Sequence, residues 1–401
     1  MKKNIFLIFL IAISFPLNAQ WVSIFEQRYM SINELQFANV NTGYAVGEDD
    51  TPGHYLLIKT TNGGVNWNKL FLDTNQIMLN VYDVSFVNEN TGYICGYSSN
   101  IFKTTNGGNN WITLYPYYLG VSMSYNAIQF LNEQIGYAVG RYGTSMKTTN
   151  GGATWNWMDT SYKAVLPNNS FFGLCFLNAN TGFMGDWNGY IFKTTNGGIN
   201  WNFYQFSNYY SFDKIRFIND NTGYAAGQNS PTNSGAIYKT TNAGDNWVKI
   251  LSHDAKIYSM NTVGESIIYA GGVFYYILKS TNAGISWIHQ SIPVNTIQRS
   301  FCFLNQNTGF CGSSEHIFKT TNGGSTFISQ LGEDIPNDYM LYQNYPNPFN
   351  PSTNIKFSVK KQGLINISLY DITGKKLKVL VNQQVQPGTY NTTFDAGSLP
   401  S

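Results

Sequence analysis

Lys59-Thr-Thr-Asn-Gly-Gly-Val-Asn-Trp67 is the first of seven copies of one phrase in this 401-residue chain. The other copies begin at Lys103, Lys147, Lys193, Lys239, Lys279 and Lys319, at intervals of 44, 44, 46, 46, 40 and 40 residues. A repeat of this length is typical of β-propeller blades and of long solenoid units. The residues between the copies decide between these two architectures.

A second phrase lies upstream of the first, in which alternating apolar residues run into Asn-Thr-Gly and an aromatic residue. Ile215-Arg-Phe217 leads to Asn221-Thr-Gly-Tyr224 in this way. Such runs indicate short strands joined by tight turns and exclude helical solenoids. In the unit that holds the second copy, we expect strands ending near residue 86 and covering 93–96, 101–105 and 111–114. The sequence therefore predicts an all-β fold, a seven-bladed β-propeller over residues 20–332.

The Gly-Gly pair predicts the geometry of the repeated turn. Its first glycine is replaced by Ala243 and Ala283 in two copies, whereas the second is glycine in all seven. We therefore expect positive φ at the second position only. The Asn before the pair can bond its own backbone, and the Trp after it can bury its ring between neighbouring sheets. These residues build the blade and form no catalytic site.

The start of the predicted propeller suggests how the ring closes. Trp21-Val-Ser-Ile24 resembles the outer strand that follows each repeated turn, but no turn precedes it. With it, eight outer segments face seven inner strands. We expect this N-terminal piece to join the last blade near residues 327–331, because closure buries an otherwise open sheet edge.

The N-terminus has the features of an export signal. Met1-Lys2-Lys3 is positive, residues 5–15 are apolar, and Leu17-Asn-Ala19 before Gln20 suits cleavage. We therefore predict a signal peptide over residues 1–19. A membrane-spanning helix needs about 20 apolar residues, and no later stretch provides them, so we expect no transmembrane span.

Charge and potential metal ligands narrow the function further. The net charge is only +2 and the four arginines are scattered, so nucleic acid is not an expected partner. The four histidines show no ligand spacing, and we predict no metal or cofactor. Four cysteines are expected to be buried as small hydrophobic residues. A disulfide between Cys302 and Cys311, which flank a turn, remains an open alternative, and we expect a monomer.

The repeated phrase also resembles a known structural device. Thr60-x-Asn62-x-Gly64-x-Asn66-Trp67 resembles the Asp-box, or BNR, hairpin of sialidase-type and sortilin-type propellers. Together with the Asn-Thr-Gly-Tyr strand, it is similar to the repeats of the photosystem II stability and assembly factors, over residues 21–332. The resemblance implies the fold and no activity, because propellers host many functions.

The composition changes after the repeats, where we predict a linker at 333–340 and a second domain at 341–401. Its phrases Tyr345-Pro-Asn-Pro-Phe-Asn-Pro351 and Leu369-Tyr-Asp-Ile-Thr-Gly374 resemble the type A sorting domain of type IX (Por) secretion in Bacteroidetes. The resemblance implies an immunoglobulin-like β-sandwich and the type IX machinery as partner. It also implies a route through the periplasm to the medium or the outer cell surface. That family continues past a phrase like Ser398-Leu-Pro-Ser401, so we expect the domain to be incomplete. This destination conflicts with a role in photosystem assembly.

The propeller topology predicts where a ligand binds. The first-to-second and third-to-fourth turns of each blade share one rim and are uniform, whereas the other loops share the opposite rim and vary. Variable loops on a rigid scaffold often carry function. Here they are rich in Tyr and Trp, which suit glycans and extended peptides. We predict ligand-binding residues at Tyr117, Tyr118, Arg141, Tyr142, Trp187, Tyr209 and Tyr210.

A glycoside hydrolase of sialidase-like or xyloglucanase-like type is the alternative. It needs two carboxylates about 5 to 9.5 Å apart, and Asp186 and Asp213 are candidates that the sequence does not pair. A salt bridge between Asp186 and Arg141 is the preferred interpretation of Asp186. The leading interpretation is a secreted or cell-surface propeller that binds a glycan or protein without catalysis.

Overall fold

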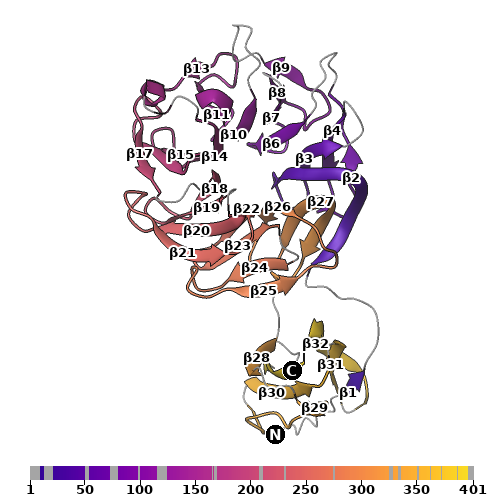
Figure 1. Cartoon of the computed structure of the whole chain (residues 1–401). Coiled ribbons are helices and arrows are strands. Elements are labelled where there is room, and N and C mark those ends of the chain that lie inside the picture. Colours follow the sequence, from indigo (N-terminus) through magenta and orange to yellow (C-terminus); the bar gives the residue numbers. More distant parts are fainter. Residues whose placement is uncertain are drawn as a thin grey trace. The chain divides into compact units, whose positions relative to one another are not determined.

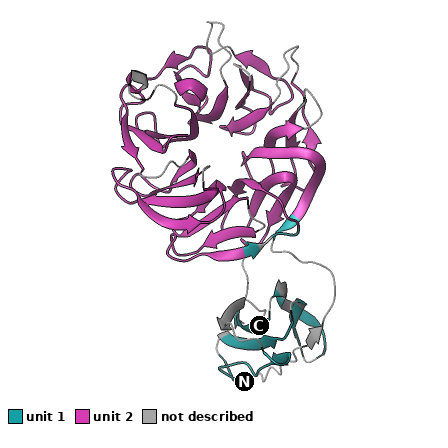
Figure 2. Cartoon of the chain, in the orientation of Figure 1, with its two compact units in different colours: residues 1–22, 290–293, 324–401 teal, residues 23–289, 294–323 magenta. Residues whose placement is uncertain are grey.

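The computed structural model divides the chain into two compact units, which are coloured separately in Figure 2. One unit comprises residues 23–289 and 294–323, and the other comprises residues 1–22, 290–293 and 324–401. The structure describes residues 10–12, 21–49, 54–72, 80–97, 100–114, 124–164, 166, 169–206, 211–229, 232–273, 276–324, 328–332, 336–349, 352–361, 363–371, 373–385 and 387–395. No helix among these residues has the length and apolarity to span a membrane.

The larger unit is a β-propeller, and five of its blades are separate four-stranded sheets (Figure 1). In each, consecutive strands pair as antiparallel neighbours in chain order. Blade 2 contains β6 (Val81–Phe86), β7 (Gly92–Gly96), β8 (Ile101–Thr104) and β9 (Ile112–Leu114). Blade 3 contains β10 (Tyr125–Phe130), β11 (Gly136–Gly140), β12 (Ser145–Thr148) and β13 (Asn156–Trp157).

The next three blades repeat this order. Blade 4 contains β14 (Phe171–Phe176), β15 (Gly182–Asp186), β16 (Tyr190–Thr194) and β17 (Asn202–Gln205). Blade 5 contains β18 (Ser211–Phe217), β19 (Gly223–Asn229), β20 (Ser234–Thr240) and β21 (Val248–His253). Blade 6 contains β22 (Ile257–Val263), β23 (Ile267–Gly272), β24 (Tyr276–Ser280) and β25 (Ile288–Ser291). The strand limits predicted for blade 2 agree with the observed ones to within two residues.

Blades 7 and 1 share one six-stranded sheet, which closes the ring. Its order is β26 (Gln298–Phe303), β27 (Gly309–Thr320), β2 (Val22–Phe37), β3 (Gly43–Asp49), β4 (His54–Thr60) and β5 (Asn68–Lys69). The second half of β2 pairs with β3 from Met30 to Phe37. The first half lies beside β27, where Ser23 Oγ is 3.0 Å from His316 Nδ1. The prediction that the N-terminal piece joins the last blade is therefore confirmed.

The predicted outer strand at residues 327–331 needs a correction. Residues 328–332 form β28 (Ile328–Gly332), which pairs with β33 (Gly388–Asp395) in the smaller unit. The first half of β2 occupies the outer position of blade 7. One long strand thus serves two blades, and the surplus outer segment expected from the sequence, residues 328–332, belongs to the smaller unit.

Aromatic rings stack across six of the seven blade interfaces among the described residues. An aromatic residue on the second strand of one blade packs on a Phe of the inner strand of the next. The stacked pairs are Tyr44–Phe86, Tyr93–Phe130, Tyr137–Phe176, Phe183–Phe217, Tyr269–Phe303 and Phe310–Phe37. Between blades 5 and 6, Thr262 takes the position of the Phe. The Trp of the repeat then packs edge-on against this Phe, as Trp111 does on Phe86.

The repeated turn corrects the prediction about its glycines. Both positions have positive φ: 66° at Gly63 and 82° at Gly64, and 59° at Ala243 where alanine takes the first place. Alanine fits there because this φ lies in the left-handed region that L-residues can occupy at a modest cost. At the second position, a Cβ on Gly64 would lie 2.7 Å from the ring of Phe310 on blade 7. At the second position, glycine is therefore favoured by the positive φ and is required by close packing against the neighbouring blade.

The four cysteines are free thiols. Cys302 pairs in register with Phe310, and Cys311 pairs with Phe301. Cys302 and Cys311 are therefore one residue out of register with each other. Their side chains point to opposite faces of the hairpin, because neighbouring positions in a strand alternate between faces. This resolves the alternative left open by the sequence in favour of thiols.

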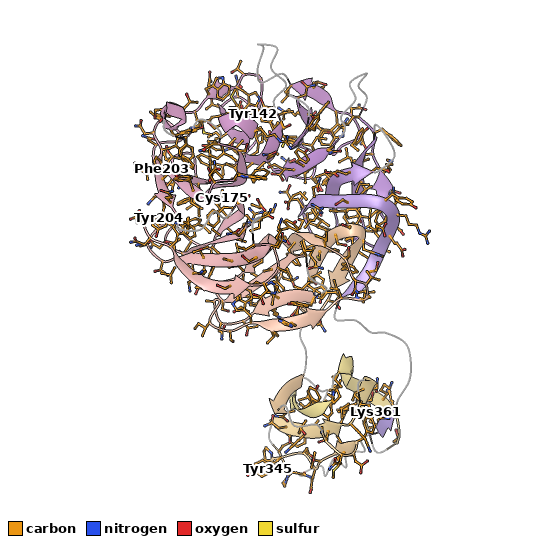
Figure 3. The ribbon with its side chains drawn as sticks, viewed as in Figure 1. Tyr142, Cys175, Phe203, Tyr204, Tyr345 and Lys361 are labelled. Carbon is orange, nitrogen blue, oxygen red and sulfur yellow. The ribbon has the colours of Figure 1, made fainter. Side chains whose placement is uncertain are left out.

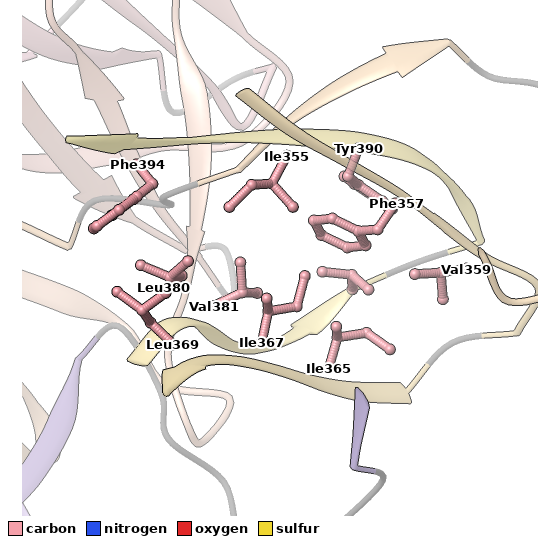
Figure 4. Packing of buried hydrophobic residues seen from close by; sticks show 11 residues of the cluster. Ile355, Phe357, Val359, Ile365, Ile367, Leu369, Leu380, Val381, Tyr390 and Phe394 are labelled. Carbon is pink, nitrogen blue, oxygen red and sulfur yellow. The ribbon is translucent and has the colours of Figure 1, made fainter. Parts of the chain in front are cut away.

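The smaller unit has two antiparallel sheets, as in a β-sandwich. One has the order β28, β33, β30 (Ser352–Val359) and β29 (Met340–Leu341). The other has the order β1 (Leu10–Ala12), β31 (Gly363–Tyr370) and β32 (Lys376–Val385). Figure 4 shows the buried side chains that fill the space between them, with Ile355 and Phe357 from β30 above Ile365 and Ile367 from β31. Of the predicted signal peptide, only β1 lies within the described residues.

Candidate functional site

The two rims of the propeller use their polar groups differently. On the uniform rim, the two turns of each blade are bonded to each other, as when Gly63 N donates to Asn41 O at 2.9 Å. The lysine of each repeat extends toward the next blade, and Lys59 Nζ donates to Gly107 O at 2.7 Å. Lys319 of blade 7 likewise donates to Gly63 O of blade 1 at 2.8 Å. These groups hold the ring together.

Three of the predicted ligand-binding residues lie within the described part of the variable rim. Arg141 and Tyr142 are exposed in the short 3-10 turn Arg141–Gly143 of blade 3, where Figure 3 labels Tyr142. Trp187 is exposed in the loop after β15 of blade 4. Tyr142 is 66% exposed and Trp187 is 55% exposed. Tyr117, Tyr118, Tyr209 and Tyr210 lie outside the described residues.

Asn169 brings these two loops together. Its backbone oxygen accepts a hydrogen bond from Gly143 N of the blade 3 loop at 2.6 Å. Its side-chain oxygen accepts one from Asn188 Nδ2 of the blade 4 loop at 3.3 Å. Trp187 N donates to Ser170 O at 2.9 Å, so the Trp187 backbone is fixed at the same place. Hydrogen bonds to residues 169–170 thus join the two loops, and we call the joined region the blade 3–4 junction (residues 141–144, 169–170 and 186–189).

Asp186 is a buried member of this junction. Its side chain is fully buried, and Oδ1 accepts hydrogen bonds from Asn188 N at 3.0 Å and Tyr190 N at 2.6 Å. Burial raises the pKa of Asp186 to about 7, although these amide hydrogen bonds act in the opposite direction. Asp186 and the exposed Arg141 form no ion pair within the described structure. The preferred interpretation of Asp186 as a salt-bridge partner of Arg141 is therefore wrong, since the carboxylate caps its own turn.

Asp213 lies near the start of β18, the inner strand of blade 5. Its carboxylate accepts hydrogen bonds from Ser211 Oγ at 2.7 Å and Gln228 Nε2 at 2.8 Å. Burial raises the pKa of Asp213 to about 6. The residues preceding the two aspartates are close, because a Cβ on Gly185 would lie 2.5 Å from Phe212 O. Each carboxylate nevertheless has its own local hydrogen-bond partners.

Sequence reasoning missed a set of seven equivalent residues on the inner strands of the blades. Every inner strand carries a β-bulge at an equivalent place, and the bulged residue is half-buried in each of them. A bulge re-aims the side chain of its extra residue. The seven bulged residues are Asn33, Tyr82, Asn126, Phe172, Asp213, Tyr258 and Arg299. Six of them lie four positions before the Phe of the inner strand, and the seventh lies four before Thr262, so aligning the repeats would have found them.

Residues that directly follow three of these bulged positions form a charged cluster. Lys214 of blade 5 donates to the carboxylate of Glu34 of blade 1, and Ser300 Oγ of blade 7 donates to Glu34 Oε1 at 2.8 Å. Burial opposes the ionisation of Glu34, but the charges of Lys214 and Arg216 bring its pKa below the ordinary value. Because blades 1 and 5 are not neighbours, this ion pair links separate parts of the ring.

A cavity of about 590 Å³ lies elsewhere, between the outer parts of blades 3 and 4. Lys147, Met158, Gly198 and Ile199 are among the residues that line it, and it includes none of the predicted site residues. In the described part of the chain, no group of three His, Cys, Asp or Glu side chains is placed to hold a metal ion.

Solved structures confirm the fold. A YCF48 bound to a D1 peptide is 16% identical with a TM-score of 0.62, and the match covers 78% of this chain and 99% of that one. YCF48 from Cyanidioschyzon merolae is 14% identical with a TM-score of 0.58, covering 75% and 98%. The GH74 xyloglucanase from Xanthomonas campestris is 12% identical with a TM-score of 0.62, covering 92% of this chain and 62% of that one. No curated protein sequence matches the chain.

Family models identify both parts of the chain. The model described as photosynthesis system II assembly factor YCF48 matches residues 15–115, 65–203 and 116–278, which together exceed half of the chain. The model described as a secretion system C-terminal sorting domain matches residues 343–401. The chain therefore belongs to the family of YCF48-like BNR propellers and carries a C-terminal sorting domain of type IX secretion.

Proposed function

We propose that this protein binds a glycan or a protein through the variable rim of its propeller, without catalysis. The observation that carries the proposal is the exposure of Tyr142 and Trp187, 66% and 55%, on two loops joined by Asn169. Large aromatic side chains exposed together on a fixed backbone are typical of recognition surfaces. A solved propeller of the same family is bound to a D1 peptide, which supports a protein ligand.

The two aspartates favour binding over hydrolysis. Asp186 Oδ1 caps its own turn, and both oxygens of Asp213 accept hydrogen bonds from neighbouring side chains, so at most one of the two carboxylates has an oxygen free for a ligand. A glycosidase needs one carboxylic acid and one carboxylate that both reach the scissile bond. The similarity to a GH74 xyloglucanase extends to the fold. Glycoside hydrolysis therefore remains the outcome that would replace this proposal.

The sorting domain indicates export to the medium or the cell surface. We further propose that residues 1–19 act as the export signal that brings the chain to the periplasm, the compartment from which type IX secretion starts. N-terminal sequencing of the exported protein should then begin at Gln20. A mature protein that retains Met1 contradicts this part of the proposal.

Binding can be tested with the full chain on a glycan array and on a displayed peptide library. Tyr142→Ala and Trp187→Ala should each weaken the binding that the wild type shows. Ile199→Ala is the matched control, since Ile199 is 71% exposed on the uniform rim of the same blade as Trp187. Turnover of chromogenic glycosides that Asp186→Asn or Asp213→Asn abolishes would establish the hydrolase instead.

A further inference from the structure

The blade 3–4 junction contains two buried polar atoms without a partner. Within the described structure, Asn169 Nδ2 and Asp186 Oδ2 are both buried and make no hydrogen bond. One is a donor and the other, in the carboxylate form, is an acceptor. Leaving such atoms unpaired costs about 1 to 3 kcal/mol each. A ligand that supplies the missing hydrogen bonds would recover this free energy, so the two atoms are candidate ligand contacts.

Asn188 contacts both of these residues. Its backbone N donates to Asp186 Oδ1 at 3.0 Å, and its Nδ2 donates to Asn169 Oδ1 at 3.3 Å. Both unpaired atoms therefore belong to side chains that meet at Asn188. The Asn188 side chain is half-buried, and its hydrogen bond to Asn169 is long. Because both unpaired atoms are buried, a ligand that binds them has to displace a neighbouring side chain.

An aromatic corner lies beside this polar pair. The ring of Trp187 is 5.9 Å from the ring of Phe172, at an interplanar angle of 40°. Phe172 is the bulged residue of blade 4 and is half-buried, so it supports Trp187 from the inner strand β14. The exposed face of an indole packs well on the C–H face of a pyranose ring, and its supported position limits the entropy lost on binding.

The chemistry of the two unpaired atoms favours a hydroxyl group. A hydroxyl can accept a hydrogen bond from Asn169 Nδ2 and donate one to Asp186 Oδ2 at the same time. A peptide side chain matches this pair only if it is Ser, Thr or Tyr, whereas every sugar residue carries several hydroxyls next to an apolar face. The combination of a flat aromatic face with an unpartnered donor and an unpartnered acceptor is therefore best matched by a saccharide.

We propose that the blade 3–4 junction is an oligosaccharide-binding site, in which a pyranose ring packs on Trp187 and one of its hydroxyls bridges Asn169 and Asp186. This inference rests on the proposed function and narrows it to one ligand class and one site. Arg141 and Tyr142, on the adjoining loop, extend the surface toward the next sugar residue.

Calorimetry of the full chain with hexasaccharides of β-1,4-glucan, xylan, mannan and chitin tests the proposal. At least one should bind, and Trp187→Ala should weaken it about tenfold, which corresponds to 1.4 kcal/mol. Trp187→Phe keeps an aromatic face and should retain most of the affinity. Asp186→Asn can place an amide donor opposite Asn169 Nδ2, and we expect a loss of at least about fivefold. Phe203→Ala is the control, since Phe203 is 45% exposed on β17 of the same blade (Figure 3).

The possible results separate this inference from the proposed function. If no hexasaccharide binds the wild type at millimolar concentration, or if Trp187→Ala binds undiminished, the saccharide site is overturned. If a library peptide binds instead and Trp187→Ala abolishes that binding, the variable rim is a binding surface but its ligand is a protein. If every ligand found binds the Tyr142→Ala and Trp187→Ala variants equally well, both proposals fail.

Discussion

At the residue scale, the two positions of the Gly-Gly pair in the repeated turn differ in how strictly they require glycine. Both positions of the Gly-Gly pair have positive φ, so conformation alone does not distinguish them. What differs is the space around each Cα. A Cβ on Gly63 would meet Val40 O at 3.3 Å, whereas one on Gly64 would meet the buried ring of Phe310 at 2.7 Å. Packing between blades thus selects the second glycine.

This difference predicts the effect of two alanine substitutions. Gly63→Ala should lower the free energy of unfolding by about 1 kcal/mol, the cost of a left-handed alanine. Gly64→Ala should lower it by about 3 kcal/mol, because overpacking against blade 7 adds to that cost. Urea-induced unfolding of both variants measures the two values. Equal losses would show that φ alone governs the turn.

Asp186 predicts how stability depends on pH. The pKa of its folded form is raised to about 7 from 3.8, so the native state binds more protons than the unfolded state between these values. Stability contributed by this group is therefore present at low pH and is lost as the pH rises toward about 7. Asp186→Asn keeps an oxygen that can accept from Asn188 N and Tyr190 N and removes the titration.

Thermal unfolding of wild type and Asp186→Asn from pH 5.0 to 7.5 checks this sign. The wild type should gain stability relative to the variant as the pH falls, and other titrating groups cancel in the comparison. Asp213→Asn should behave similarly up to about pH 6, since the Asp213 pKa is raised to about 6. A difference that stays constant with pH would show that Asp186 titrates normally.

At the scale of the element, each blade attaches to the next through a repeated lysine. Lys279 is only 4% exposed, its Nζ lies 5.4 Å from the ring centre of Tyr269, and it donates to Gly323 O of blade 7 at 2.9 Å. Lys193 differs, because its Nζ pairs with the exposed Asp245 at 2.6 Å. The same sequence position therefore makes a buried link in one blade and a surface ion pair in another.

The two lysines should contribute unequally to stability. Lys279→Met should lower the free energy of unfolding by about 2 kcal/mol, since a buried hydrogen bond to a charged donor is lost. Lys193→Met should cost less than about 1 kcal/mol, as is typical of exposed ion pairs. Chemical denaturation of both variants at two salt concentrations provides the comparison. A larger loss for Lys193→Met would contradict this assignment.

At the scale of the whole molecule, β2 holds the propeller closed. This one strand pairs with β27 of the last blade and with β3 of the first. Glu34 on the same strand binds Lys214 from blade 5, so β2 also reaches the far part of the ring. A closed ring leaves no open inner edge between the first and last blades.

Two truncations test this closure. A chain beginning at Trp21 keeps β2 and should unfold at the same temperature as the longer chain. A chain beginning at Met30 loses the outer strand of blade 7 and should unfold at a temperature at least about 10 °C lower. Differential scanning calorimetry of both chains measures this. Similar transitions for the two would show that the last blade is stable without the first half of β2.

The sequence by itself determined the all-β class, the seven blades, the two families and the identity of the uniform rim. It could do so because each of these depends on local patterns that recur at a fixed spacing, such as the turn around Gly63 and Gly64. The exposed positions of Arg141, Tyr142 and Trp187 were also predictable, since variable loops follow from the strand order.

Only the tertiary structure decided which residues meet. Asn169 joins two loops through contacts between blades, Asp186 turns inward to cap its own loop, and Lys214 reaches Glu34 across 180 residues. The strand at 328–332 pairs with β33 rather than with blade 7. Such pairings depend on how the strands of different blades are placed in space, and spacing along one chain does not encode that placement.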